Sequence, residues 1–262
     1  MLFTILGSGG FIGTRLERHF RENGHEVYAP GKGAAAIFDR DLGRVVYAVG
    51  LTADFRHRPY DTVEAHVCLL SRILREAHFS TITYLSSTRV YQGAKTGNEN
   101  CALRVFPDAD GLYNLTKLTG EALCLQTGRA QVARLSNIVG EGASESFVSQ
   151  LMAAAVTGRV QLRSALSSAK DYLLIDDAIN ALAALATHGE TGIYNIASGQ
   201  NISTAEILEA LSTRLKFEAS VAESGTEFSF PLIDVARISK LLGWQPQCVT
   251  TWIKETMLLK QQ

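Results

Sequence analysis

The sequence lacks any long apolar run, any paired-cysteine motif and any excess of charge of one sign. No stretch approaches the roughly 20 apolar residues that cross a bilayer, and Met1 leads straight into a predicted strand. Neither a membrane span nor a secretory leader is therefore expected. The four cysteines lie far apart with no C-x-x-C pair, which argues against a disulfide framework or a zinc site. We expect reduced thiols, no metal and a cytoplasmic protein.

The charge balance excludes further classes of partner. The formal net charge is -1 and the isoelectric point is about 6.6, so we expect neither nucleic acid nor an anionic membrane surface as a partner. The chain shows no internal repeat and no low-complexity tract. Its 262 residues are enough to bury one large core, or one core and a smaller lobe.

The first residues have the pattern of a nucleotide-binding unit. Residues 2–6 are apolar and predict a short buried strand, and residues 14–23 have helical spacing. Between them, a glycine-rich turn contains Gly7, Gly10 and Gly13. These glycines permit a sharp turn, a close approach of backbone to a pyrophosphate, and close packing of the helix. The N-terminus of the helix offers free N–H groups and a partial positive charge to phosphate, so a dinucleotide site is predicted here.

Two further motifs can carry acid–base chemistry. A predicted strand over residues 81–85 leads into a Ser-Ser-Thr-Arg-Val-Tyr run that contains Ser87, and Tyr113 and Lys117 are neighbours on a predicted helix. Free tyrosine has a pKa near 10, and a lysine about 4 Å away stabilises the phenolate by up to ~4 kcal/mol at an effective dielectric near 20. The pair can therefore form a base near neutral pH. The buried stripe of this helix is predicted to be Leu115, Leu118, Ala122 and Leu125.

Together these motifs resemble the extended short-chain dehydrogenase/reductase family. The likeness rests on G-x-x-G-x-x-G, S-S-x-x-V-Y and Y-x-x-x-K, and it extends over nearly the whole chain. It implies an α/β fold, with a doubly wound, Rossmann-like parallel sheet and a small C-terminal substrate lobe. The expected dinucleotide-binding domain is residues 1–160, and the expected lobe is residues 161–262. The two interleave, because a late strand near 193–197 rejoins the sheet.

The resemblance also implies roles for individual residues. Ser87 is expected to touch the reacting oxygen, Tyr113 to carry the proton, and Lys117 to hold the phenol ionised and bind the nicotinamide ribose. At the tip of the second strand, Gly31 replaces the acid typical of NAD binding and Lys32 follows. The cofactor is therefore NAD or NADP with NADP slightly favoured, although Lys32 is equally well interpreted as a solvated charge. The expected cofactor-binding residues are Gly7, Gly10, Phe11, Ile12, Gly13, Lys32, Ala48, Val49, Gly50, Tyr113 and Lys117, with Thr52 beside them.

Two more residues are expected at the nucleotide end of a substrate. Asn137 lies in an R-x-x-N-x-x-G stretch that resembles the one by which sugar-nucleotide members of the family hold the nucleotide; a turn asparagine is the alternative. Lys170 stands where relatives carry an arginine against the diphosphate, and lysine keeps the charge but loses the bidentate fork. Together with Ser87, these are the predicted substrate-binding residues. His66, where the family commonly has an asparagine near the cofactor, is interpreted as a structural or surface residue.

The resemblance implies an NAD(P)-dependent enzyme whose substrate is a nucleotide sugar. Thr88 and Arg89 stand where dehydratases carry an Asp-Glu pair, and neither can act as that acid–base pair at neutral pH. Dehydration is thus disfavoured. A 4-epimerase that works by transient hydride transfer is expected first, and an NADPH-dependent reductase of a 4-keto sugar nucleotide second. A dehydrogenase of a non-sugar alcohol and a non-catalytic dinucleotide sensor stay open. By analogy with relatives, a homodimer is expected.

Overall fold

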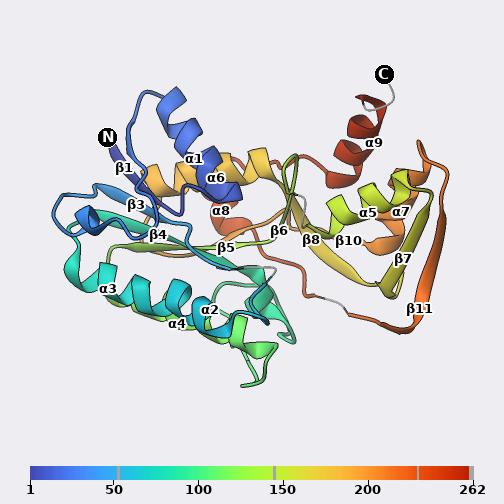
Figure 1. Ribbon diagram of the computed structural model, residues 1–262, viewed down its shortest axis with the longest axis horizontal. Helices are drawn as coiled ribbons and strands as arrows, with labels where there is room; N and C mark the ends of the chain where they lie inside the picture. The colour runs from blue at the N-terminus through green and yellow to red at the C-terminus, as the bar shows by residue number, and fades with distance from the viewer. Residues whose placement is uncertain (52–53, 144–145, 229, 260–262) are drawn as a thin grey trace.

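A parallel sheet of six strands forms the centre of the protein. The computed structural model describes residues 1–51, 54–143, 146–228 and 230–259, and the strand order in this sheet is β2-β1-β3-β4-β5-β9. All neighbouring strands run parallel, and the order reverses beside β1 (Figure 1). The predicted doubly wound α/β fold is therefore confirmed. The strands are β1 (Leu2–Leu6), β2 (Glu26–Tyr28), β3 (Arg44–Tyr47), β4 (Thr81–Ser87), β5 (Ala130–Leu135) and β9 (Gly192–Ile196).

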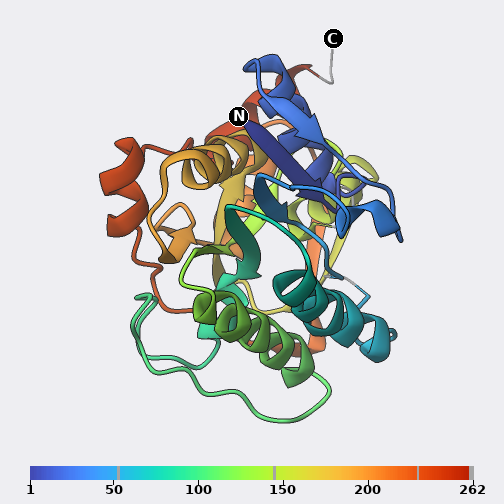
Figure 2. The same ribbon diagram turned by 90° about the vertical axis from the view of Figure 1, so that its left-hand side faces the viewer.

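Helices cover both faces of this sheet. On one face pack α1 (Phe11–Glu22), α6 (Ile175–His188) and α8 (Ala236–Leu242), and on the other α3 (Leu69–Glu76) and α4 (Gly111–Gln126). Figure 2 shows α3 and α4 side by side on their face. Helix α2 (Pro59–Val63) continues through one π-helical turn, Glu64–Cys68, into α3. Within the described ranges, no helix is long and apolar enough to cross a membrane.

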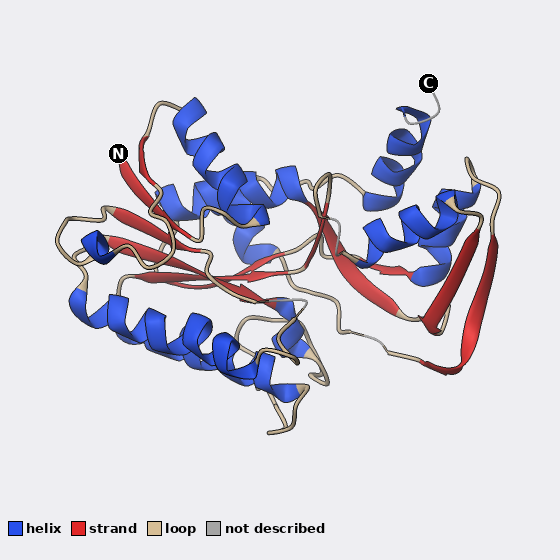
Figure 3. Ribbon diagram, viewed as in Figure 1, coloured by secondary structure: helices blue, strands red, loops and turns tan. Residues whose placement is uncertain are grey.

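A smaller lobe begins where β5 ends. One residue after β5, the chain enters a three-stranded sheet in the order β10-β8-β6, next to a parallel pair of β7 and β11 (Figure 3). The lobe has its own apolar core, which includes Val139 and Val148. Its strands are β6 (Asn137–Val139), β7 (Arg159–Ser164), β8 (Ala169–Leu174), β10 (Asn201–Ser203) and β11 (Glu218–Thr226), and its helices are α5 (Phe147–Val156), α7 (Thr204–Ser212) and α9 (Val249–Leu259).

The late strand predicted near 193–197 is β9. It pairs with β5 in the main sheet, so the chain leaves the lobe and returns to it at β10. The division of the chain at residue 160 stays a prediction.

Helix α4 buries a different face from the predicted one. Leu115, Leu118 and Leu125 are only partly buried and Ala122 is exposed, so the predicted stripe is wrong. The helix instead packs closely on β4 through Gly120, where a Cβ would lie 2.4 Å from the hydroxyl oxygen of Tyr84. The face turned inward by this packing carries mostly polar side chains. It consists of Tyr113, Asn114, Thr116, Lys117, Gly120, Glu121 and Cys124.

A buried ion pair joins α4 to β5. Arg134 Nη2 lies 2.7 Å from Glu121 Oε2, and the two side chains are only 3% and 4% exposed. The Ser86 hydroxyl donates to the same carboxylate. Arg134 also donates to the Tyr91 hydroxyl at 2.8 Å, and that hydroxyl donates to Asn195 Oδ1 at 2.8 Å. One polar network therefore connects α4, β4, β5 and β9.

Replacing Glu121 with alanine should lower the free energy of unfolding by about 3–5 kcal/mol, because Arg134 would be left buried without a counter-charge. Urea unfolding followed by circular dichroism measures the change. The control is Glu17→Ala, which breaks an exposed pair with Arg21 and should cost less than about 1 kcal/mol. Equal losses in the two variants would contradict a structural role for the buried pair.

Candidate active site

The glycine turn between β1 and α1 is tightly packed on one side and open on the other. Gly7 has a φ of 92°, and a Cβ there would lie 2.8 Å from the backbone of Ala48. A Cβ on Gly13 would lie 2.2 Å from the carbonyl oxygen of Gly7. Gly10 donates its N–H to the Gly7 carbonyl at 3.0 Å, and beside it a Cβ on Gly9 would meet no atom within 4 Å. The turn thus leaves open the space that a pyrophosphate needs.

The first turn of α1 points its backbone donors toward that space. Gly10 is the N-cap residue and no side chain caps the helix, so the first N–H groups have no intrahelical acceptor. The positive end of the helix dipole lies there too, and the site fits a phosphate. The side chains of Phe11 and Ile12 pack against the core. These two residues can therefore contribute backbone donors rather than side-chain contacts.

The end of β3 lies beside the glycine turn, where the strand order reverses. Ala48 and Val49 are half-buried and Gly50 is exposed, and the N–H of Ala48 donates to Leu6 at 2.8 Å. Thr52 lies outside the described residues. A ligand at such a reversal contacts the carboxyl ends of both strands, which is where these residues stand.

Two cations lie near the end of β2. Lys32 is exposed in the loop that follows the strand. The guanidinium carbon of Arg40 lies 4.0 Å from the ring centroid of Tyr28, the last residue of β2. Arg40 was not predicted, because it is eleven residues beyond that strand's expected end at Ala29 and reaches Tyr28 only through the fold.

Strand β4 and helix α4 bring Ser87 and Tyr113 together. Ser87 ends β4, and its Oγ accepts the N–H of Arg89 at 3.2 Å. Tyr113 lies in the first turn of α4 and is 5% exposed. Burial raises the pKa of Tyr113, and the neighbouring Ser87 hydroxyl and the Arg89 guanidinium oppose that rise. Tyr113 is therefore protonated at neutral pH and can donate a proton.

Lys117 lies one turn after Tyr113. Its Nζ donates to the carbonyl of Leu85 at 2.9 Å and lies 5.8 Å from the Tyr113 ring centroid. Burial lowers the pKa of Lys117 to about 7, and Glu121 opposes the decrease. The Arg89 guanidinium opposes the rise in the pKa of Tyr113, and the predicted role of Lys117 in holding the phenol ionised stays a prediction.

His66 lies in the π-helical turn and is fully buried. Its Nδ1 is 2.9 Å from the Thr116 hydroxyl, which donates to the Tyr113 carbonyl at 3.0 Å. Nε2 is buried with no partner among the residues described. A Cβ on Gly50 would lie 3.0 Å from His66 Nε2 and 3.4 Å from Lys117 Nζ. Gly50, His66 and Lys117 therefore lie close together.

Arg89 lies over the same tyrosine. Its guanidinium carbon is 5.8 Å from the Tyr113 ring centroid and 5.2 Å from that of Phe55, and these two rings are 5.2 Å apart. Burial and the nearby Arg56 lower the pKa of Arg89. The immediate surroundings of Tyr113 are therefore both aromatic and cationic.

The predicted substrate residues Asn137 and Lys170 lie on neighbouring strands of the lobe. Asn137 is exposed at the start of β6, and its Nδ2 donates to the Asp171 carbonyl at 2.8 Å. Lys170 Nζ lies 4.3 Å from the Phe228 ring centroid, and its pKa is lowered by burial and by Arg89. Lys170 is thus close enough to interact electrostatically with Arg89 beside Tyr113. The Asn137 amide, in contrast, already makes a structural hydrogen bond.

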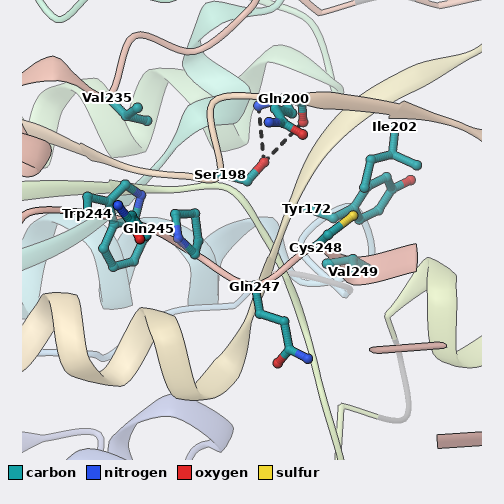
Figure 4. A pocket seen from close by; sticks show the side chains of 11 residues that line it. Tyr172, Ser198, Gln200, Ile202, Val235, Trp244, Gln245, Gln247, Cys248 and Val249 are labelled. Atoms are coloured by element: carbon teal, nitrogen blue, oxygen red, sulfur yellow. Dashed lines mark hydrogen bonds between the residues drawn. The ribbon is translucent and has the colours of Figure 1, made fainter. Parts of the chain in front are cut away.

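A separate cavity of about 320 Å³ lies in the lobe (Figure 4). It is lined by residues of β8, of β10 and of the segment between α8 and α9, among them Tyr172, Ile202 and Trp244. Ser198 and Gln200 close one side through hydrogen bonds of 3.1 Å between them. None of the predicted catalytic or cofactor residues that the structure describes lines this cavity, so it is distinct from the candidate site.

Comparison with known proteins places the chain among enzymes that bind nicotinamide cofactors. Residues 3–197 match the NAD dependent epimerase/dehydratase family. GDP-6-deoxy-D-mannose reductase of Pseudomonas aeruginosa is 28% identical over 200 residues, a match that covers 68% of this chain and 65% of the reductase. The chain therefore matches slightly less than two thirds of the length of that relative.

Two solved structures share the fold over nearly their full lengths. RMD from Pseudomonas aeruginosa complexed with NADPH has a TM-score of 0.77 at 22% identity, covering 98% of this chain and 97% of that one. UDP-glucuronic acid 4-epimerase from Bacillus cereus in complex with NAD has a TM-score of 0.85 at 14% identity and covers 98% of both chains.

The buried imidazole of His66 makes stability depend on pH. Burial and Lys117 lower its pKa from 6.5 to about 3. Between these pH values His66 is mostly protonated in the unfolded chain and mostly neutral in the folded protein. The contribution of the neutral His66 imidazole to the free energy of unfolding is therefore complete above pH 6.5 and decreases as the pH falls toward 3. The His66→Asn variant should be less stable than wild type at pH 7.5, and the difference in free energy of unfolding should shrink by pH 5. The control is His57→Asn, at an exposed position. A difference from wild type that stays constant with pH would contradict the buried neutral imidazole.

Proposed function

Since this chain belongs to the NAD-dependent epimerase/dehydratase family, we propose that it transfers hydride between a nicotinamide cofactor and a carbon of a nucleotide-linked sugar. The observation that supports this most is the placement of Tyr113, protonated and beside the Ser87 hydroxyl, at the carboxyl end of β4. In this proposal the open glycine turn and the Lys117 amine face the cofactor. When bound there, the nicotinamide supplies or accepts the hydride.

We assign the roles as follows. Ser87 hydrogen-bonds the reacting oxygen of the sugar and orients it. Tyr113 gives a proton to that oxygen, or takes one from it, at its phenolic oxygen. Lys117 holds the nicotinamide ribose, for which its position beside Gly50 is suitable. Lys170 binds the diphosphate and Asn137 the nucleotide end. A homodimer remains the expected assembly.

Within this class we propose reduction of a keto sugar ahead of the 4-epimerisation expected first from the sequence. The curated relative at 28% identity is a reductase. Epimerisation remains the second candidate, because the same residues would serve it and a structure at a TM-score of 0.85 is an epimerase.

An assay with UDP-, dTDP- and GDP-linked sugars and their 4-keto derivatives tests the proposal. Stoichiometric consumption of NADPH with a 4-keto sugar is expected, and Tyr113→Phe should lower turnover by at least ~10²-fold while it leaves cofactor binding intact. Interconversion of sugar isomers without net change in cofactor absorbance would favour the epimerase instead. If both reactions are absent in a protein that binds NADPH, the proposed function is wrong.

We also propose that NADP is the preferred cofactor, because the end of β2 carries cations in place of an acid. Lys32 and Arg40 stand near the position where a 2′-phosphate would lie. Fluorescence titration should show tighter binding of NADPH than of NADH, and Arg40→Gln should weaken NADPH by about tenfold, the worth of one charge-assisted hydrogen bond. NADH is the internal control, since its affinity should stay unchanged. Binding of NADH at least about tenfold tighter than NADPH in wild type would contradict the preference.

A further inference from the structure

Arg89 is fixed next to the proposed reacting centre. It lies in the 3-10 turn Thr88–Tyr91, and its backbone N–H donates to the Oγ of Ser87 at 3.2 Å. Its guanidinium faces the rings of Phe55 and Tyr113 at 5.2 and 5.8 Å from their centroids. A group held by this guanidinium is therefore close to the two hydroxyls that meet the substrate.

The charge around Arg89 is unbalanced. Its Nε atom is buried and lacks a hydrogen-bond partner in the part of the chain that the structure describes. Among the described residues, the carboxylate that acts on Arg89 is that of Asp110, which is itself paired with Arg56, and Lys170 adds another positive charge. A buried donor without a partner costs about 1–3 kcal/mol, and more when it is charged. The site is thus suited to an anion that the protein does not itself supply.

We propose that Arg89 binds a carboxylate on the sugar, so that the substrate is a nucleotide-linked acidic sugar. This inference rests on the proposed function. A guanidinium presents a planar pair of donors that matches a carboxylate in bidentate geometry. The diphosphate is the other anion of such a substrate, but the sugar separates it from the reacting carbon, whereas Arg89 faces Tyr113 at the reacting end. Lys170, on β8 of the lobe, is the cation that we assign to the diphosphate.

Calorimetric titration of the protein saturated with NADP tests this. The probes form a uridine, a guanosine and a thymidine series, each with the nucleoside diphosphate alone, its neutral glycosyl form and its glycuronosyl form. In the series that binds best, the glycuronosyl form should bind at least about tenfold tighter than the glycosyl form, as one charge-assisted pair predicts. Arg89→Gln should abolish that ratio and leave the other two ligands within about twofold of wild type. Arg89→Lys should keep part of it.

Lys170→Gln is the matched control, since loss of a diphosphate contact weakens all three ligands of a series equally. Thermal melting and NADPH affinity check that each variant is folded, and the ratio in wild type tests the inference without any variant. Equal weakening of all three ligands by Arg89→Gln, or no preference of wild type for the acidic sugar, overturns the inference and leaves the proposed function in place. If no sugar nucleotide of any series binds while NADPH does, the proposed function fails, and the inference fails with it.

Discussion

The buried ion pair of Glu121 and Arg134 is the interaction on which the candidate site depends. Burying an ion pair is favourable only when hydrogen bonds satisfy the remaining donors and acceptors of both side chains. Here Ser86 and Tyr91 provide such hydrogen bonds. Ser86 directly precedes Ser87, the predicted catalytic serine. Tyr91 ends the turn that carries Arg89, and Glu121 lies one helical turn beyond Lys117. The carboxylate also counteracts the decrease in the pKa of Lys117. One network thus sets both the positions and the charge of the site.

The sequence predicted the order and type of the elements better than the faces that they bury. The first strand, the glycine turn and the first helix could be read directly, because short-range apolar spacing and glycines dictate them. The buried face of α4 could not. Apolar periodicity assumes that the inward face is apolar, but α4 turns Tyr113, Lys117 and Glu121 inward because strands distant in sequence supply partners for them. The return of β9 to the main sheet followed only from the family resemblance, since nothing local encodes a strand's neighbour.

The same limit separates the parts of the site that were anticipated from those that were not. The motifs located Ser87 and Tyr113 at adjoining element ends, and their catalytic roles remain predictions. His66 was interpreted as a structural or surface residue, because a lone helical histidine usually is one. A surface position is wrong, since His66 is fully buried, and no periodicity reveals the π-helical turn that carries it. Arg89 lies two residues after Ser87 in the sequence. Its importance depends on a buried Nε atom that has no hydrogen-bond partner in the described part of the chain, which a sequence does not show.

The main sheet receives its last strand from beyond most of the lobe. Strands β6, β7 and β8 precede α6 and β9 in the chain, and β9 then pairs with β5. During synthesis from the N-terminus, the outer edge of β5 therefore stays unpaired until residue 196 has left the ribosome. An open parallel edge is a template for wrong partners, and long-range pairing of this kind is slow. The two cores consequently cannot fold one after the other as the chain is synthesised. A fragment that ends at residue 160 would keep the outer edge of β5 exposed permanently.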